Sequence, residues 1–84
     1  MKEVMMVVGA GQISLAITRR MGYGKKIILG DIHKENADKI AQIMNDAGFD
    51  VESIHMDLSS KDSILHMIEV AKSYGEISMF INGA

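Results

Sequence analysis

Short apolar runs alternate with segments of helical spacing along the whole chain, and this alternation restricts its fold more than any other feature. The apolar runs cover residues 4–8, 27–29, 51–55 and 77–81. The first, second and fourth are nearly continuous, as expected of strands that are buried on both faces. The third alternates between apolar and polar residues, which is typical of an edge strand.

Apolar residues recur at helical spacing in each of the three intervening segments. The stripes consist of Ile13, Ala16, Ile17 and Met21, then Ala37, Ile40, Ala41, Met44 and Ala47, and finally Ile64, Met67, Ile68, Ala71 and Tyr74. Gly22, Gly48 and Gly75 follow these stripes, where the C-terminal cap of a helix belongs. Residues 59–62, Ser-Ser-Lys-Asp, predict a capping box at the start of the third helix.

This order predicts an α/β fold with a parallel sheet and right-handed crossovers. If the second and third strands lie on one side of the first strand and the fourth on the other, the sheet order is 3-2-1-4. Helices would cover both faces, which gives a three-layer, Rossmann-like half formed by one domain over residues 1–84. Its strand order reverses beside the turn after the first strand, where doubly wound folds bind ligands.

A glycine turn, Gly9-Ala10-Gly11, follows the first strand. Gly9 allows a sharp turn, and Gly11 lacks a Cβ and lets the main chain approach a pyrophosphate. The next residues, Gln12 and Ile13, open a helix whose unpaired N–H groups and positive dipole end attract phosphates. Ser14 replaces the third glycine of the dinucleotide-binding fingerprint, so the pattern is GxGxxS.

Asp31 ends the second apolar run and is followed by Ile32. The aspartate lies about 20 residues after the turn, where a carboxylate can accept hydrogen bonds from ribose hydroxyls. The sequence therefore predicts a dinucleotide as the ligand. A carboxylate would repel the 2′-phosphate of NADP, so we expect NAD to be preferred. Lys34 could offset this repulsion, but a lysine in the first turn of a helix is usually solvated.

Composition and charge exclude several other classes of function. The net charge of −2 provides no basic surface for nucleic acid. No apolar stretch approaches the roughly 20 residues of a membrane span. The absence of cysteine excludes disulfides and agrees with a cytoplasmic protein. His55 and Asp57 could share a strand face, but no third ligand is apparent, so no metal site is expected.

The glycine turn and Asp31, together with two later segments, resemble the short-chain dehydrogenase/reductase family over essentially the whole chain. The later segments are Asp57-Leu58 after the third strand and residues 80–84, Phe-Ile-Asn-Gly-Ala. The resemblance implies that Asp57 contacts the adenine amino group and that the backbone of Leu58 faces the ring. It also implies that Asn82, Gly83 and Ala84 lie beside the cofactor, with Gly83 where the family commonly has a second asparagine.

The catalytic residues of that family have no counterpart in this sequence. Neither Tyr23 nor Tyr74 is followed by a lysine four residues later, so the Tyr-x-x-x-Lys pair is missing, as is the catalytic serine. No catalytic residue is therefore predicted. We expect a truncated, NAD(H)-binding N-terminal portion of such an oxidoreductase, inactive on its own.

Two other classes of function remain open. One is the S-adenosylmethionine-binding half of a methyltransferase, which would also use a glycine turn and an acid on the ribose. The other is a stand-alone nucleotide-binding or sensing module. In each case the fourth strand has an open apolar edge, and one sheet face is covered only by the helix over residues 62–74. These features predict a homo-oligomer formed through that edge or that face.

Overall fold

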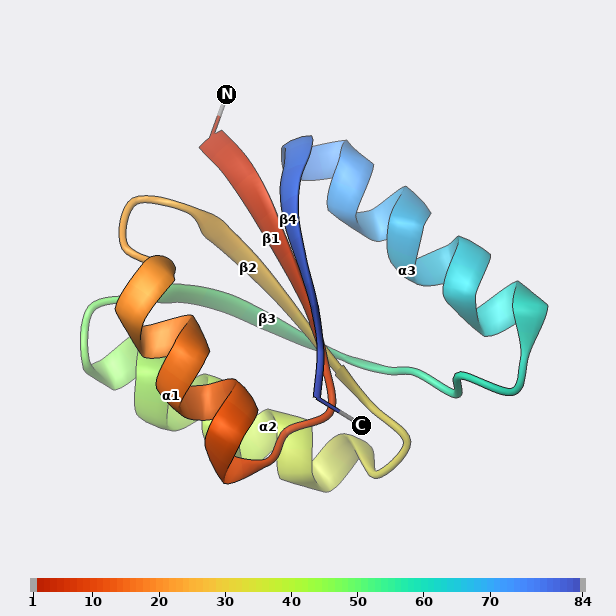
Figure 1. Ribbon diagram of the computed structural model, residues 1–84, viewed down its shortest axis with the longest axis horizontal. Helices are drawn as coiled ribbons and strands as arrows, with labels where there is room; N and C mark the ends of the chain where they lie inside the picture. Colours follow the sequence, from red (N-terminus) through yellow and green to blue (C-terminus); the bar gives the residue numbers. More distant parts are fainter. Residues whose placement is uncertain (1, 84) are drawn as a thin grey trace.

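A parallel sheet of four strands forms the middle layer of the fold (Figure 1). The computed structural model describes residues 2–83 of the 84-residue chain, and all of their side chains except that of Ile13. The strands are β1 (Lys2–Val8), β2 (Lys26–Asp31), β3 (Asp50–His55) and β4 (Gly75–Asn82). Their order is β3-β2-β1-β4, so the predicted 3-2-1-4 order and the edge position of β3 are confirmed.

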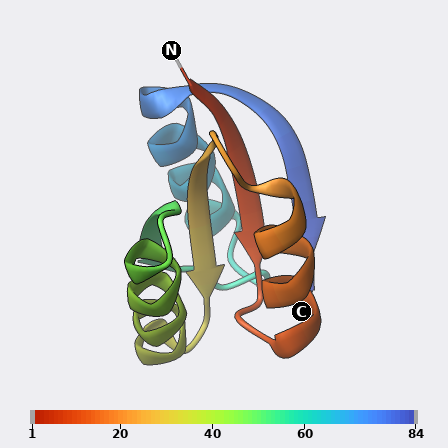
Figure 2. The same cartoon turned by 90° about the vertical axis from the view of Figure 1, so that its left-hand side faces the viewer.

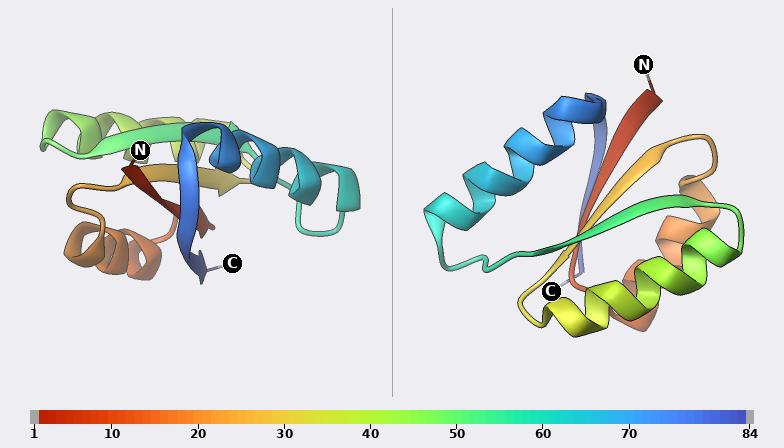
Figure 3. Two further views of the ribbon diagram at one scale, coloured as in Figure 1. Left: turned by 90° about the horizontal axis from the view of Figure 1, so that it is seen from above. Right: turned by 180° about the vertical axis from the view of Figure 1, so that it is seen from behind.

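Three helices cover the two faces of this sheet. They are α1 (Gln12–Met21), α2 (Lys34–Asp46) and α3 (Lys61–Tyr74). Figure 1 shows α1 and α2 on one side of the strands and α3 on the other, and Figures 2 and 3 show the same separation from other directions. Within residues 2–83, α3 is the only helix on its face of the sheet, as the sequence predicted. None of the three helices in the described part of the chain is long and apolar enough to cross a bilayer.

Alternating residues of the strands supply two apolar cores, one on each face of the sheet. The core beneath α2 consists of Met5, Val7, Ile27, Leu29, Ala37, Ala41, Met44, Phe49 and Val51. The core beneath α3 consists of Val4, Met6, Val8, Ile28, Met56, Met67 and Ala71. Successive side chains of a strand point to opposite faces, and helices cover both faces of this sheet. The central strands β1 and β2 are therefore buried on both sides.

The apolar stripes predicted for α2 and α3 are confirmed in their central positions. Ala37, Ala41 and Met44 are buried in α2, and Met67 and Ala71 are buried in α3. The helix start predicted near residues 59–62 is confirmed, but the predicted capping box is wrong in detail: Ser60 is the N-cap, and its hydroxyl accepts a hydrogen bond of 3.2 Å from the backbone N–H of Ser63. The last members of the two stripes, Ala47 and Tyr74, are exposed.

The apolar stripe predicted for α1 is wrong. Ala16 is exposed, and Ile17 and Met21 are 37% and 45% exposed. Ser14 and Thr18, each 2% exposed, are the buried positions instead. Their side chains are small, and the Thr18 hydroxyl satisfies its donor by bonding the carbonyl oxygen of Ser14 at 2.6 Å. Apolar periodicity cannot reveal a buried helix face that is made of small polar residues.

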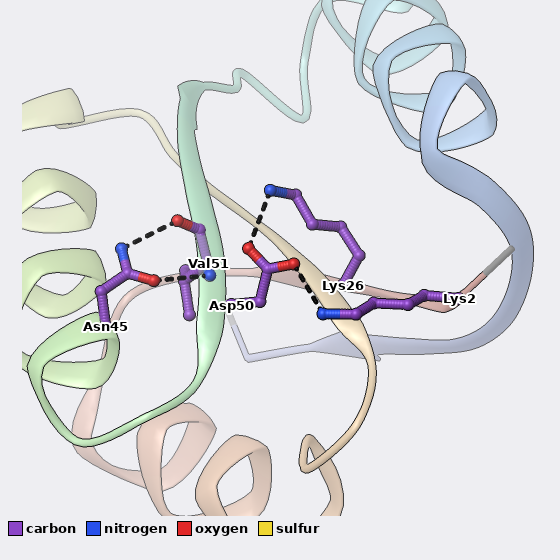
Figure 4. A network of polar contacts seen from close by, with 5 residues as sticks. All are labelled: Lys2, Lys26, Asn45, Asp50 and Val51. Atoms are coloured by element: carbon purple, nitrogen blue, oxygen red, sulfur yellow. Dashed lines mark hydrogen bonds and ion pairs between the residues drawn. The ribbon is translucent and has the colours of Figure 1, made fainter.

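Charged residues tie together the amino ends of three strands. The Asp50 carboxylate lies 3.1 Å from Nζ of Lys2 and 3.1 Å from Nζ of Lys26 (Figure 4). Burial acts to raise the pKa of Asp50, but the hydrogen bonds from the two lysines hold that pKa below its ordinary value. Beside this group, the Asn45 side chain makes two hydrogen bonds to the main chain of Val51. These contacts join β1, β2, β3 and α2 at the end of the sheet opposite the glycine turn.

Candidate functional site

The turn between β1 and α1 leaves open space in front of the helix. Gly9 has a φ of +92°, in the left-handed region that favours glycine, and its N–H donates to the Gly30 carbonyl at 2.8 Å. Gly11 is the N-cap residue of α1, and apart from its two chain neighbours no described heavy atom lies within 4 Å of the place that a Cβ on it would occupy. The first turn of α1 contains no acidic residue. The turn can therefore accept an anion at its N–H groups.

Asp31 lies at the end of β2 and is bonded directly to this turn. One carboxylate oxygen, Oδ2, accepts a hydrogen bond of 2.7 Å from the Ala10 N–H. The other, Oδ1, accepts one of 2.8 Å from the His33 N–H. A carboxylate has about four lone-pair sites, so each oxygen retains capacity to accept a ligand hydroxyl. The glycine turn and the acid that the sequence pairs with it thus form one unit.

Asp57 follows β3 and is held in a fixed orientation by the start of α3. Its Oδ1 accepts hydrogen bonds from the Ser59 N–H at 2.9 Å and from the Ser59 hydroxyl at 2.7 Å. The hydroxyl bond and then the backbone bond from Ser59 hold the pKa of this carboxyl below its ordinary value. The N–H of Asp57 in turn donates to the Ser63 hydroxyl at 2.9 Å. The Asp57 side chain is therefore an ionised carboxylate at neutral pH.

The carboxyl ends of the strands enclose a cleft of about 450 Å³. Its lining includes predicted residues that follow each of the four strands: Gly9, Gly11, Asp31, Ile32, Asp57, Leu58 and Gly83. Residues far apart in the sequence meet here because parallel strands end at the same edge of the sheet. The lining combines the carboxyl groups of Asp31 and Asp57 with the positive dipole end of α1 and several apolar side chains.

Other predicted site residues lie elsewhere. Gln12 is exposed as the first residue of α1, and Asn82 lines a neighbouring groove, so neither side chain is part of the cleft lining. The backbone of Ile13 lies in α1, whereas its side chain falls outside what the structure describes. Ala84 also lies outside the described residues.

The cleft contains five residues that the sequence did not single out as cofactor contacts: Val8, Ala10, His33, Asn36 and Met56. Ala10 contributes the N–H that bonds Asp31, and its place between two glycines was the available signal. His33 contributes its N–H in the same way because it follows Asp31 by two residues. Asn36 gave no comparable signal, since a polar residue in a first helical turn is common.

A second groove of about 450 Å³ adjoins the cleft on the α3 side of the sheet. It is lined by Met6, Met56, Leu58, Ile64, Ile68, Ile77, Phe80 and Asn82. Met56 and Leu58 line both hollows. The Phe80 side chain is 55% exposed. This groove is almost wholly apolar, in contrast to the charged rim of the cleft.

Both tyrosines are engaged away from the cleft. Tyr23 stacks on Phe49, with ring centroids 4.3 Å apart. Tyr74 lies under the Lys26 ammonium, and its hydrogen bond to Glu52 raises the pKa of the phenol above its ordinary value. A general acid or base works best with a pKa near neutrality, so this shift has the wrong direction for such a role. Within residues 2–83, no group of three or more His, Cys, Asp or Glu side chains is placed to hold a metal ion.

Comparisons with known proteins agree with this geometry. The family model of the short chain dehydrogenases matches residues 3–84. The chain is 38% identical over 76 residues to the short-chain dehydrogenase/reductase bsc3 of Alternaria brassicicola, a match that covers 90% of this chain and 28% of that protein.

Solved structures show the same fold. An actinorhodin polyketide ketoreductase with NADPH matches with a TM-score of 0.90 and 26% identity, over 99% of this chain and 33% of that one. A short chain dehydrogenase/reductase from Burkholderia phymatum in complex with NAD matches with a TM-score of 0.80 and 18% identity, over 94% of this chain and 29% of that one. The chain therefore spans about a third of the length of these relatives.

Proposed function

The chain belongs to the short-chain dehydrogenase family, and we propose that its cleft is the NAD(H)-binding site of an oxidoreductase of that family. The observation that carries the proposal is the hydrogen bond between the Asp31 carboxylate and the Ala10 N–H. This bond sets a sugar acceptor directly beside a turn that is open to phosphate. The bound dinucleotide would supply hydride chemistry to such an enzyme.

The open turn fits the diphosphate of the ligand. Gly11 has room in front of it, and the N–H groups of Gln12 and Ile13 open α1 with the positive end of its dipole. The glycines at 9 and 11 keep side chains out of this space. In our proposal these residues bind phosphate oxygens through main-chain donors.

The two carboxylates fit the adenosine end. Asp31 accepts hydrogen bonds from the ribose hydroxyls, and Asp57 accepts one from the adenine amino group. Ile32 and Leu58, 55% and 41% exposed, provide apolar surface on either side of the ring. These roles follow the family resemblance and agree with the position of each residue in the lining of the cleft.

We further propose that NAD is preferred to NADP. The Asp31 carboxylate would repel a 2′-phosphate. Lys34 is the nearby cation that could reverse this preference, but its Nζ lies 3.0 Å from Oδ1 of Asp38, one turn along α2. An ammonium that is paired in this way is less available to a ligand phosphate.

Isothermal titration calorimetry of the chain with NAD, NADH, NADP and S-adenosylmethionine tests the proposal. We expect binding of NAD and NADH and weaker binding of NADP. Selective binding of S-adenosylmethionine would instead assign the cleft to methyl transfer. The chain on its own should show no hydride transfer, because neither tyrosine is placed to exchange a proton in the cleft.

We also propose that the chain associates with itself through β4. This strand is an edge of the sheet, and the exposed ring of Phe80 projects from it beside the apolar groove. An unpaired apolar edge strand favours pairing with another chain. The expected assembly is a homo-oligomer.

A further inference from the structure

Ser14, in the first turn of α1, lies against Gly83, just after β4. A Cβ built on Gly83 would lie 1.7 Å from Oγ of Ser14 and 3.0 Å from its Cβ. Heavy atoms that are not bonded to each other cannot approach so closely. The serine hydroxyl therefore occupies the space that any side chain at position 83 would need.

Neither residue can move away easily. The Gly83 N–H donates to the Val8 carbonyl at 2.8 Å, which ties position 83 to the end of β1. The carbonyl oxygen of Ser14 accepts the Thr18 hydroxyl at 2.6 Å. Rotation of the Ser14 side chain about its Cα–Cβ bond would move Oγ away but would leave the two Cβ atoms 3.0 Å apart, so the backbone would still have to shift by a few tenths of an ångström. Ser14 is also 2% exposed, so its side chain has packed atoms around it.

The third glycine of the dinucleotide fingerprint serves the close packing of the helix against the sheet. In this chain Ser14 stands at that position of the fingerprint, and the residue without a side chain is Gly83, on the opposite side of the contact. We propose that Ser14 and Gly83 form a size pair, in which Gly83 supplies the space that the fingerprint glycine would otherwise provide. By fixing Gly83, the pair positions the wall of the cleft at the end of β4.

The consequence for the ligand rests on the proposed function. Gly83 lines the cleft, whereas Ser14 lies behind it in the interior. A side chain at position 83 would push the segment after β4 away from α1 and would widen the cleft. Dinucleotide affinity should then fall, although no group that touches the ligand has been removed.

A double-mutant cycle with urea unfolding tests the pair in the full chain. Gly83→Ala should lower the folding equilibrium constant by about 5- to 150-fold, the range for overpacking. In the Ser14→Gly background the same change should cost at least about fivefold less, because the space is now present. A matched control is Gly75→Ala, at the other end of β4, where a Cβ would lie 2.1 Å from the Lys2 carbonyl oxygen. Ser14→Gly should give no rescue there.

The outcomes separate the size pair from the proposed function. If Gly83→Ala does not fold, folding of the Ser14→Gly/Gly83→Ala double variant supports the pair. The size pair would be overturned if the double variant fails to fold while Ser14→Gly folds. It would also be overturned if Gly83→Ala lowers the folding equilibrium constant equally in the two backgrounds. For variants that fold, the NAD dissociation constant should rise with Gly83→Ala and return toward its original value in the double variant. Coupling in stability without NAD binding by the unmodified chain would support the pair and overturn the proposed function.

Discussion

The carboxylate of Asp31 accepts a 2.7 Å hydrogen bond from the backbone N–H of Ala10, so the acid after β2 and the turn after β1 are joined without any ligand. The position of a ribose acceptor relative to the phosphate-binding turn is thus set by the fold. Preorganisation of this kind lowers the ordering cost that binding would otherwise incur.

Asp31→Asn should weaken NAD binding by about tenfold or more, because hydrogen bonds to a charged acceptor contribute about 1.5–3 kcal/mol. Calorimetry would measure the change. Asp46→Asn removes the same charge from the end of α2, away from the cleft lining, and should leave the affinity unchanged. Equal affinities of the Asp31 variant and the unmodified chain would contradict the proposed role.

Asp38→Asn should strengthen NADP binding while leaving NAD binding nearly unchanged. The substitution releases the Lys34 ammonium from its partner 3.0 Å away. Exposed pairs of this kind contribute about 1 kcal/mol or less, so a gain of about two- to fivefold in NADP affinity is expected. Titration of both cofactors into the variant and into Lys34→Met/Asp38→Asn provides the test. An equal gain in the double variant would show that Lys34 is not the cause.

Stability should fall as the pH falls below about 5. The pKa of Asp50 is lower in the folded chain than in the unfolded chain, so its stabilising effect is present above the unfolded pKa and is lost as pH falls through the folded pKa. Because Asp50 is partly exposed, its share is about 1 kcal/mol or less. Urea unfolding between pH 7 and pH 3 should show a smaller loss for Asp50→Asn than for the unmodified chain. Parallel curves would exclude this explanation.

Phe80→Lys should reduce self-association without unfolding the chain. The Phe80 ring is largely exposed on an edge strand, and a lysine at such a position opposes edge-to-edge pairing. Sedimentation velocity at several concentrations should show a shift toward monomer. Lys72→Arg, a change on the exposed side of α3, serves as the control. A monomeric unmodified chain at high concentration would contradict the proposal for β4.

Much of the fold follows from the sequence because the signals are strong and local. The continuous apolar runs of β1 and β2 reflect burial on both faces, and the stripes of α2 and α3 reflect burial on one. The buried face of α1 could not be predicted, because its most buried side chains are those of Ser14 and Thr18. Their burial depends on how closely α1 approaches the sheet, and the spacing of apolar residues in the sequence does not indicate this distance.

The cleft likewise contains some residues that the sequence could predict and others that it could not. Asp31 could be predicted because an acid at the end of the second strand is placed to accept hydrogen bonds from the ribose of a dinucleotide. The contributions of Ala10 and His33 come from main-chain N–H groups, which every residue except proline carries, so their identities give no signal. The opposition of Ser14 and Gly83 is a contact between distant segments, and it appears only once β4 is placed beside β1.

The ion pairs of Asp50 with Lys2 and Lys26 lie at the amino ends of the strands, whereas the cleft lies at their carboxyl ends. The seven residues of β1 separate the two sites by roughly 20 Å. At that separation, substitutions at the two ends should contribute additively. The rigidity of the scaffold can accordingly be adjusted at its base, which leaves the ligand-facing rim free to be redesigned independently.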